Sequence, residues 1–240
     1  IRRGAKDKNI QVQLARAYLL QGKFDAVLKG LPDDVSDPEV RLSVLLARAR
    51  AHLGLRELDA AEKAFGEAEK IKPEDVRPKV GGAQVLVNRG KLKEAEEKVD
   101  AAIQVKADSA DALVLKGELR RLNRDLEGAV AAFDKALTGA GTNIPARLGR
   151  AAALIDLNKD EAAQADIQAV FQRIPKHPLA SYLSALSLSK KKDFTGAQEA
   201  LQQAGPSLDN HMPSVFLRGA INYALNQLEQ AAANLSRYVS

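Results

Sequence analysis

A pattern of small and large apolar residues returns every 34 residues along this chain, with no insertion between its copies. One position is always small, and it holds Ala15, Ala49, Ala83, Gly117, Ala151, Ala185 and Gly219. A second position is mostly alanine, and it holds Val27, Ala61, Ala95, Ala129, Ala163, Ala197 and Ala231. A third is mostly large, and it holds Leu31, Phe65, Val99, Phe133, Ile167, Leu201 and Leu235. Small residues let two helices approach closely while large neighbours fill the remaining space, so the period predicts a row of packed helix pairs.

Each copy of the pattern reads as two helices joined by a short turn. In the second helix of one copy, Ala129, Phe133 and Ala136 lie at i, i+4 and i+7, which is a single helical stripe. The residue after the turn is Phe24, Leu58, Leu92, Leu126, Asp160, Phe194 or Leu228. Only the fifth copy departs from a large apolar side chain there, and the short connections require neighbouring helices to be antiparallel.

Capping signals mark the starts of several expected first helices. Asp37 precedes Pro38, Asp75 precedes the third copy, and Asn143 precedes the fifth. The second helix of the first copy is expected to be short, because Gly30 and Pro32 stop it.

The predicted organisation is a single all-α array over residues 1–240. We expect repeats near residues 8–41, 42–75, 76–109, 110–143, 144–177, 178–211 and 212–240, after residues 1–7 as the tail of a preceding repeat. The chain starts at Ile1 and both ends cut a repeat short. We therefore expect a fragment of a longer array, with any export signal or anchor outside it, and with cut repeat ends as candidates for homo-association.

The motifs LARAYLLQGKFDAV, ARAHLGLRELDAAEKAFGEAEKIKP and AQVLVNRGKLKEAEEKVDAAI resemble the tetratricopeptide repeat (TPR) family. The resemblance extends over nearly the whole chain. It implies a right-handed superhelical solenoid whose first helices line a concave groove. It also implies a non-enzymatic scaffold that binds a protein or peptide partner there, because the family signature is a packing code and not a reaction site.

The amino-acid composition excludes several kinds of functional site. The chain has no cysteine, which excludes disulfides, thiolate metal sites and a cysteine nucleophile. No run of 18 apolar residues is present, so no transmembrane segment is expected. The net charge of +5 fits a solvated surface of mixed charge and gives only weak support for a nucleic-acid partner.

Residues with catalytic or ligating chemistry do not form a constellation. His177 and His211 share one repeat position just before a helix start, and His52 takes a packing position. Without a third ligand, the two equivalent histidines read as helix-entry residues. Basic clusters at Lys190–Lys192 and around Arg121 lie where first helices end, and cations there favour the helix dipole. We expect no catalytic residue, no cofactor and no metal.

The candidate partner-binding residues are the inward positions of the first helices. They are Val12, Arg16, Leu46, Arg50, Val80, Val114, Leu148, Tyr182, Leu186, Phe216 and Tyr223. The last four are expected to form an apolar, aromatic patch in repeats six and seven. None of the first inward positions is lysine, so a clamp for a chaperone's C-terminal carboxylate is not expected.

Three longer runs carry a more specific resemblance. They are LKGELRRLNRDLEGAVAAFDKAL, IPKHPLASYLSALSLSKKKDFTGAQEAL and HMPSVFLRGAINYALNQLEQAAANLSRYV. These runs are similar to the TPR lipoproteins of the bacterial exosortase/PEP-CTERM system, a family linked to exopolysaccharide production and protein sorting at the cell envelope. The resemblance implies a periplasmic chain anchored to the outer membrane through a missing N-terminus, while a cytoplasmic location stays open.

A helical-repeat RNA-binding protein is the alternative hypothesis. The basic isoelectric point near 9.3 favours it. The apolar first inward position and the 34-residue period disfavour it, since pentatricopeptide RNA readers have polar residues there and a period of 35.

Overall fold

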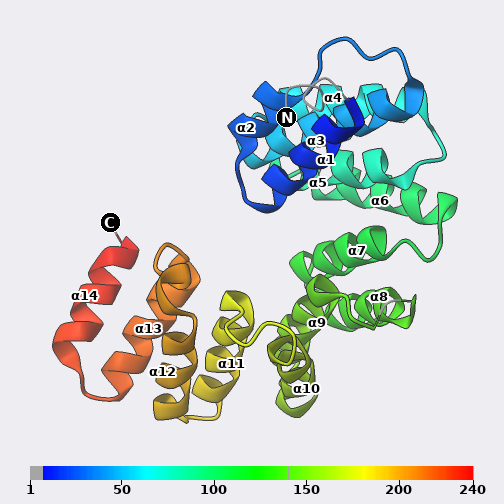
Figure 1. The fold of residues 1–240 in the computed structure, drawn as a ribbon. Coiled ribbons are helices and arrows are strands. Elements are labelled where there is room, and N and C mark those ends of the chain that lie inside the picture. Colours follow the sequence, from blue (N-terminus) through cyan, green and yellow to red (C-terminus); the bar gives the residue numbers. More distant parts are fainter. Residues whose placement is uncertain (1–7, 140, 240) are drawn as a thin grey trace. The chain divides into compact units, whose positions relative to one another are not determined.

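The computed structural model describes residues 8–139 and 141–239, and the predicted tail at residues 1–7 lies outside them. The described residues form α-helices and one short 3-10 helix, with no strand, which confirms the all-α prediction (Figure 1). The chain folds into two compact units, residues 1–119 and residues 120–240. The expectation that all the repeats form a single array stays a prediction.

The first unit contains the early helix pairs. Its helices are α1 (Lys8–Leu20), α2 (Phe24–Gly30), α3 (Pro38–Gly54), α4 (Leu58–Ile71), α5 (Val76–Asn88) and α6 (Leu92–Val105), followed by α7 (Ala110–Leu122), most of which belongs to this unit. Odd-numbered helices are the first helices of the repeats and even-numbered helices are the second. The seven-residue α2 is as short as Gly30 and Pro32 predict.

The second unit continues the same alternation. Its helices are α8 (Leu126–Gly139), α9 (Ile144–Asp156), α10 (Asp160–Phe171), α11 (Pro178–Lys190), α12 (Phe194–Gln203), the 3-10 helix η2 (Gly205–Leu208), α13 (Met212–Ala224) and α14 (Leu228–Val239). Every second helix in both units begins at the residue predicted to follow the turn. Asp160, the exception in that column, also begins its helix, and its carboxylate accepts a hydrogen bond of 2.7 Å from the Ser187 hydroxyl.

The predicted capping residues start the first helices. Asp37 accepts a hydrogen bond of 2.9 Å from the Val40 N–H. Asp75 accepts one of 2.9 Å from the Arg77 N–H. Asn143 likewise accepts at 2.9 Å from the N–H of Ala146. These oxygens satisfy amide groups that have no partner within the helix.

A single left-handed residue makes the turn inside every repeat. The residues with positive φ there are Gly22 (68°), Arg56 (60°), Gly90 (75°), Arg124 (64°), Asn158 (58°), Lys192 (64°) and Asn226 (60°). The residue that follows donates to a carbonyl five residues earlier, as Lys23 does to Tyr18 at 2.9 Å. This is the Schellman arrangement, which ends the first helix and redirects the chain.

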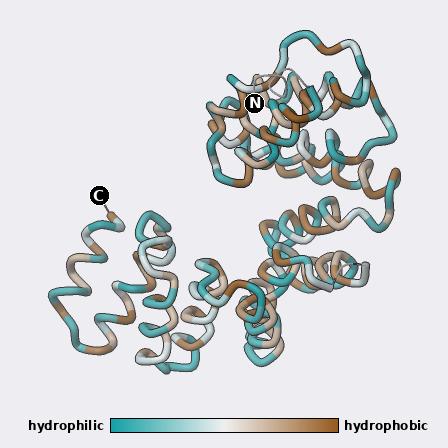
Figure 2. Tube along the Cα trace, viewed as in Figure 1, coloured by the Kyte–Doolittle hydropathy of each residue, from teal (hydrophilic) through white to brown (hydrophobic). Residues whose placement is uncertain are grey.

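The repeating columns form the cores of both units. The alanine-rich column is buried throughout, from Val27 (0 % exposed) to Ala231 (3 %). Hydrophobic and hydrophilic stretches are mixed along the helices and are not gathered into one apolar segment (Figure 2). Among the described residues, no helix is both long enough and apolar enough to cross a membrane.

Neighbouring repeats fit together through a matched pair of positions. The large residue in the middle of α4, α6 or α8 meets a residue 16 positions later on the next first helix. A Cβ atom built on Gly81 would lie 2.2 Å from the Phe65 ring, and one on Gly149 would lie 2.4 Å from the Phe133 ring. Where the large position holds the smaller Val99, the facing residue is Leu115 in the same apolar cluster. At these three junctions the two volumes therefore compensate each other.

This compensation predicts strong coupling between Phe133 and Gly149. Gly149→Leu alone should destabilise the protein by about 1–3 kcal/mol through overpacking, and Phe133→Val alone by a similar amount through a cavity. The double variant copies the Val99–Leu115 junction and should regain most of the loss. Chemical denaturation of the four proteins measures the coupling, and simple addition of the two single costs would contradict the fit described above.

Candidate functional site

Three of the predicted groove residues do not reach the surface. Val12 is 3 % exposed, Leu46 is 5 % exposed and Leu148 is 6 % exposed. Each packs in the apolar cluster of its own and the adjoining helices. These three are therefore packing residues and not part of an accessible groove.

The other predicted groove residues of the first unit differ in polarity and in exposure. Arg16 and Arg50 are exposed, whereas Val80 and Val114 are half-buried. Val80 packs against the cluster formed by α5, α6 and α7. The structure therefore does not gather an apolar surface from the inward positions of this unit.

The second unit carries the aromatic residues at these inward positions. Phe216 is 49 % exposed and Tyr223 is 69 % exposed, and both lie on α13. Tyr182 and Leu186 of α11 are half-buried and pack against the core clusters on both sides of that helix. We call Tyr182, Leu186, Phe216 and Tyr223 the aromatic face.

Ring contacts hold part of the aromatic face in place. Tyr182 meets His211 edge-on, with ring centroids 5.1 Å apart and an interplanar angle of 78°. Phe216 meets Tyr238 of α14 at 5.1 Å with a tilt of 49°. Aromatic pairs in such geometries add stability beyond the area they bury. His211 and Tyr238 were not predicted as site residues, because neither occupies an inward position.

A charged pair lies beside Tyr182. Arg121 Nη1 is 3.4 Å from an Asp156 carboxylate oxygen. Burial raises the pKa of the Tyr182 hydroxyl above its ordinary value, the charge of Arg121 lowers that pKa, and the charge of Asp156 raises it. The aromatic face is thus bordered by one cation and one anion from the two preceding repeats. Asp156 was missed because it falls one residue after the third inward position of its helix.

The basic clusters serve the helix ends, as their sequence positions predict. Lys190 Nζ donates to the Ile155 carbonyl oxygen at 2.5 Å, in the last turn of α9. Arg124 and Lys192 are left-handed turn residues. Arg120 pairs with Asp125 at 2.7 Å across the turn that contains Arg124. A cation placed at a carbonyl end of a helix stabilises the helix dipole.

His177 and His211 are helix-entry residues, as expected from the sequence, whereas His52 Nδ1 lies 2.6 Å from a Glu57 carboxylate oxygen. His177 precedes α11, and its Nδ1 accepts a bond of 3.4 Å from the Ala180 N–H. His211 precedes α13, where its Nδ1 lies 2.6 Å from the Ser214 hydroxyl. Among the described residues, no group of three or more histidine or carboxylate side chains is arranged to hold a metal ion.

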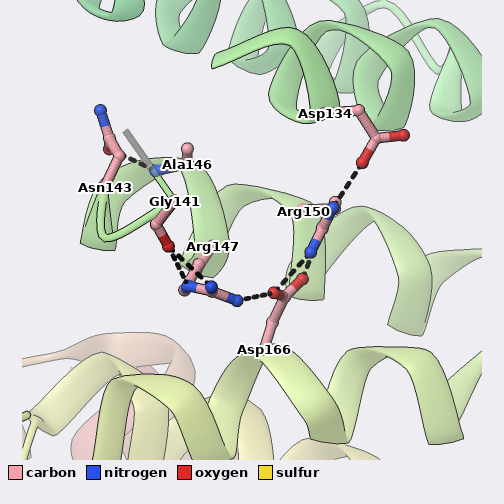
Figure 3. Close-up of polar contacts among 7 residues, drawn as sticks. All are labelled: Asp134, Gly141, Asn143, Ala146, Arg147, Arg150 and Asp166. Carbon is pink, nitrogen blue, oxygen red and sulfur yellow. Dashed lines mark hydrogen bonds and ion pairs between the residues drawn. The ribbon is translucent and has the colours of Figure 1, made fainter. Parts of the chain in front are cut away.

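The most buried carboxylate belongs to a structural network at the junction of α8, α9 and α10. Asp166 is 1 % exposed. Its carboxylate accepts hydrogen bonds from Arg150 Nε at 2.7 Å and from Arg147 Nη1 at 2.9 Å (Figure 3). Arg150 also pairs with Asp134 at 2.5 Å, and the hydrogen bonds that its guanidinium donates to Asp166 and to Asp134 raise its pKa. Arg147 further donates to the Gly141 carbonyl at 2.6 Å.

The network ties three helices and one loop together. Both carboxylate oxygens of Asp166 accept hydrogen bonds from guanidinium groups, so this residue holds α9 and α10 together.

Comparisons with known proteins agree with this geometry. Residues 42–75 and residues 80–144 match two models of the tetratricopeptide repeat. A search of curated protein sequences gives no significant match.

Several solved structures have the same fold. PilW, a widely conserved type IV pilus biogenesis factor, superposes with a TM-score of 0.70 at 19% identity, covering 85% of this chain and 93% of its own. PilF of Pseudomonas aeruginosa gives 0.68 at 15% identity, covering 82% and 90%. YrrB, a TPR protein with an unusual peptide-binding site, gives 0.52 at 19% identity, covering 72% and 89%. The matched segments are therefore tetratricopeptide repeats, and the described helices form a TPR solenoid fold.

His177 makes the start of α11 sensitive to acid. Burial lowers the pKa of its imidazole below the ordinary 6.5, so the unfolded chain binds a proton more readily than the folded one. The stabilisation is complete above pH 6.5 and is lost as the pH falls through the lower folded pKa. The loss should be about 1 kcal/mol or less, which is what one capping bond contributes. His177→Asn keeps a capping acceptor without titrating, so thermal melts of this variant should depend less on pH across that range; equal pH slopes would refute the assignment.

Proposed function

We propose that this chain is a non-enzymatic protein-interaction scaffold and that the aromatic face binds a protein or peptide partner. The observation that carries the proposal is the exposure of Phe216 (49 %) and Tyr223 (69 %) beside the half-buried Tyr182. The aliphatic residues of the Phe216 column are buried or half-buried. An exposed aromatic group with a polar border is typical of a binding surface.

The arrangement fits a partner that brings apolar side chains and main-chain polar groups together. Tyr182 and Leu186 supply a half-buried floor held by the core, and Phe216 and Tyr223 supply area that becomes buried only on binding. Arg121 offers N–H donors and Asp156 offers acceptors at the border. Anchored rings lose little conformational freedom on binding, which is why such residues carry much of an interface's energy.

We also propose a setting at the bacterial envelope, in exopolysaccharide production or protein sorting, for a periplasmic and lipid-anchored chain. The support is the resemblance of three sequence runs to TPR lipoproteins of the exosortase/PEP-CTERM system. The fold shared with PilW, a pilus biogenesis factor, is consistent with it. Detection of the full-length chain in outer-membrane fractions tests the setting, and exclusive recovery with cytoplasmic proteins would contradict it.

The binding proposal predicts which substitutions affect affinity. Peptides selected from a displayed random library should bind the Phe216→Ala, Tyr223→Ala double variant about 30-fold more weakly than the parent, since the best aromatic anchors contribute about 2 kcal/mol. Thermal stability should change little because both rings are exposed. Leu20→Ala, at a side chain 91 % exposed in the first unit, is the matched control and should not alter affinity. Unchanged affinity in the double variant would remove the aromatic face from the proposal.

Homo-association through the end helices is a further proposed interaction. The second-helix position that holds the buried Ala68 and Ala102 holds Tyr238 in α14, which is 47 % exposed beside Val239 at 81 %. On α1, Ile10 is 50 % exposed, where the equivalent residues of later first helices are buried. The exposed side of α14 thus corresponds to a second-helix surface that the next repeat covers at an internal junction. The exposed side of α1 corresponds to the first-helix surface that covers it. We propose that α14 of one copy stacks on α1 of a second copy.

Head-to-tail stacking predicts concentration-dependent mass. Sedimentation of the parent should give a mass that rises with concentration, because a heterologous contact of this kind does not close on itself. Tyr238→Ser combined with Val239→Ser should remain monomeric. A parent that stays monomeric at every concentration would exclude the contact.

A further inference from the structure

One position on the first helices holds a cation in four repeats, as Arg48, Lys116, Arg150 and Arg218, and holds Leu14, Gly82 and Ser184 in the other three. Arg48 pairs with Asp33 at 2.6 Å. Lys116 pairs with Asp100 at 2.8 Å and with Glu96 at 2.9 Å. One repeat later, Arg150 pairs with Asp134 at 2.5 Å, as seen in Figure 3. At these junctions a cationic side chain joins the first helix to the preceding second helix or, for Arg48, to the loop that follows α2.

Ser184 takes this position on α11, 34 residues after Arg150. Its side chain is buried (7 % exposed) and lines a cleft. The preceding second helix has changed with it, because Gln164 and Gln168 stand where the Lys116 junction has Glu96 and Asp100. The long cation and its carboxylates are therefore replaced together by one short hydroxyl and two neutral amides.

A cleft lies among residues of α10, α11 and α12. It has a volume of about 460 Å³ and is lined by Ser184, Gln164, Gln168 and Gln203, with Phe171 and Leu188 as apolar walls. Glu199 of α12 also lines it and is the one charged residue of the lining. The cleft thus combines one carboxylate, several uncharged acceptors and an apolar wall.

We propose that this cleft binds the side chain of an arginine carried by a protein partner. A guanidinium group there would take the place that the chain's own Arg150 takes one repeat earlier. Glu199 supplies a charge-assisted acceptor, and the oxygens of Gln164, Gln168 and Ser184 supply neutral ones. Leu188 and Phe171 offer apolar surface to the methylene arm. Arginine is preferred to lysine because its planar fork of N–H donors engages several acceptors at once.

This site is separate from the aromatic face and does not depend on it. The aromatic face consists of the inward positions of α11 and α13. The cleft is lined by residues of α10 and α12 together with Ser184 and Leu188 of α11. One partner segment or two different ones can therefore be tested at the two sites independently.

The test is an NMR titration of the labelled protein with N-acetyl-arginine methylamide, alongside the lysine and citrulline analogues. We expect saturable shifts in the side-chain amide signals of Gln164, Gln168 and Gln203 with the arginine probe. The citrulline probe, which has the same shape without the charge, should bind at least about tenfold more weakly. Glu199→Gln should weaken arginine binding by a similar factor.

Ser184→Arg is the decisive variant. It restores the cation found at Arg48, Arg150 and Arg218, so the protein should stay folded, with its own guanidinium filling the cleft, and lose the arginine shifts. Ser189→Arg adds the same charge to the same helix outside the cleft lining and should keep them. The proposal is overturned by the absence of saturable shifts, by equal binding of citrulline, or by binding that persists in Ser184→Arg. If Ser184→Arg does not fold, unchanged arginine binding in Glu199→Gln overturns it instead.

Discussion

The fit between a large residue on one second helix and the facing residue of the next first helix governs how the repeats stack. Phe65 and Phe133 each face a glycine that leaves room for an aromatic ring, whereas Val99 faces Leu115. The backbone path can then stay nearly the same at every junction, although the side chains differ. Because interiors are packed to the density of organic crystals, a mismatch of even one ring at a junction would displace the following helix.

Polar contacts form a second layer over this apolar fit. Cations of the first helices pair with carboxylates of the preceding repeat, and the Asp166 network joins three helices at one junction. Buried pairs of this kind add less stability than their geometry suggests, since both ions lose water. Their effect is greater on register, because a guanidinium held by two carboxylates fits only one alignment of the helices. Gly82 and Ser184 stand where the other junctions have a cation of the first helix.

The sequence was sufficient to predict the helix pairs, because each pair rests on local signals. The turn column from Phe24 to Leu228 fixes where second helices start, and Asp37, Asp75 and Asn143 fix where several first helices start. The site was less predictable. Helical periodicity gives the direction of Val12, Leu46 and Leu148 but not their depth, and only the packed structure shows that these side chains are buried. Asp156, His211 and Tyr238 join the site through contacts between repeats, which no spacing within one repeat encodes.

The left-handed residue inside each repeat has a consequence for the order in which the chain acquires structure. The reversal from Tyr18 to Lys23, like its equivalents, is closed by a hydrogen bond between residues five apart and needs no distant segment. Contacts between residues close in sequence form quickly, and domains of a growing chain fold as they are synthesised. We expect helix pairs to become protected one after another as they leave the ribosome, which pulse-labelled hydrogen exchange on stalled chains would record. A chain of this design exposes little more than one unpaired helix at a time to its surroundings.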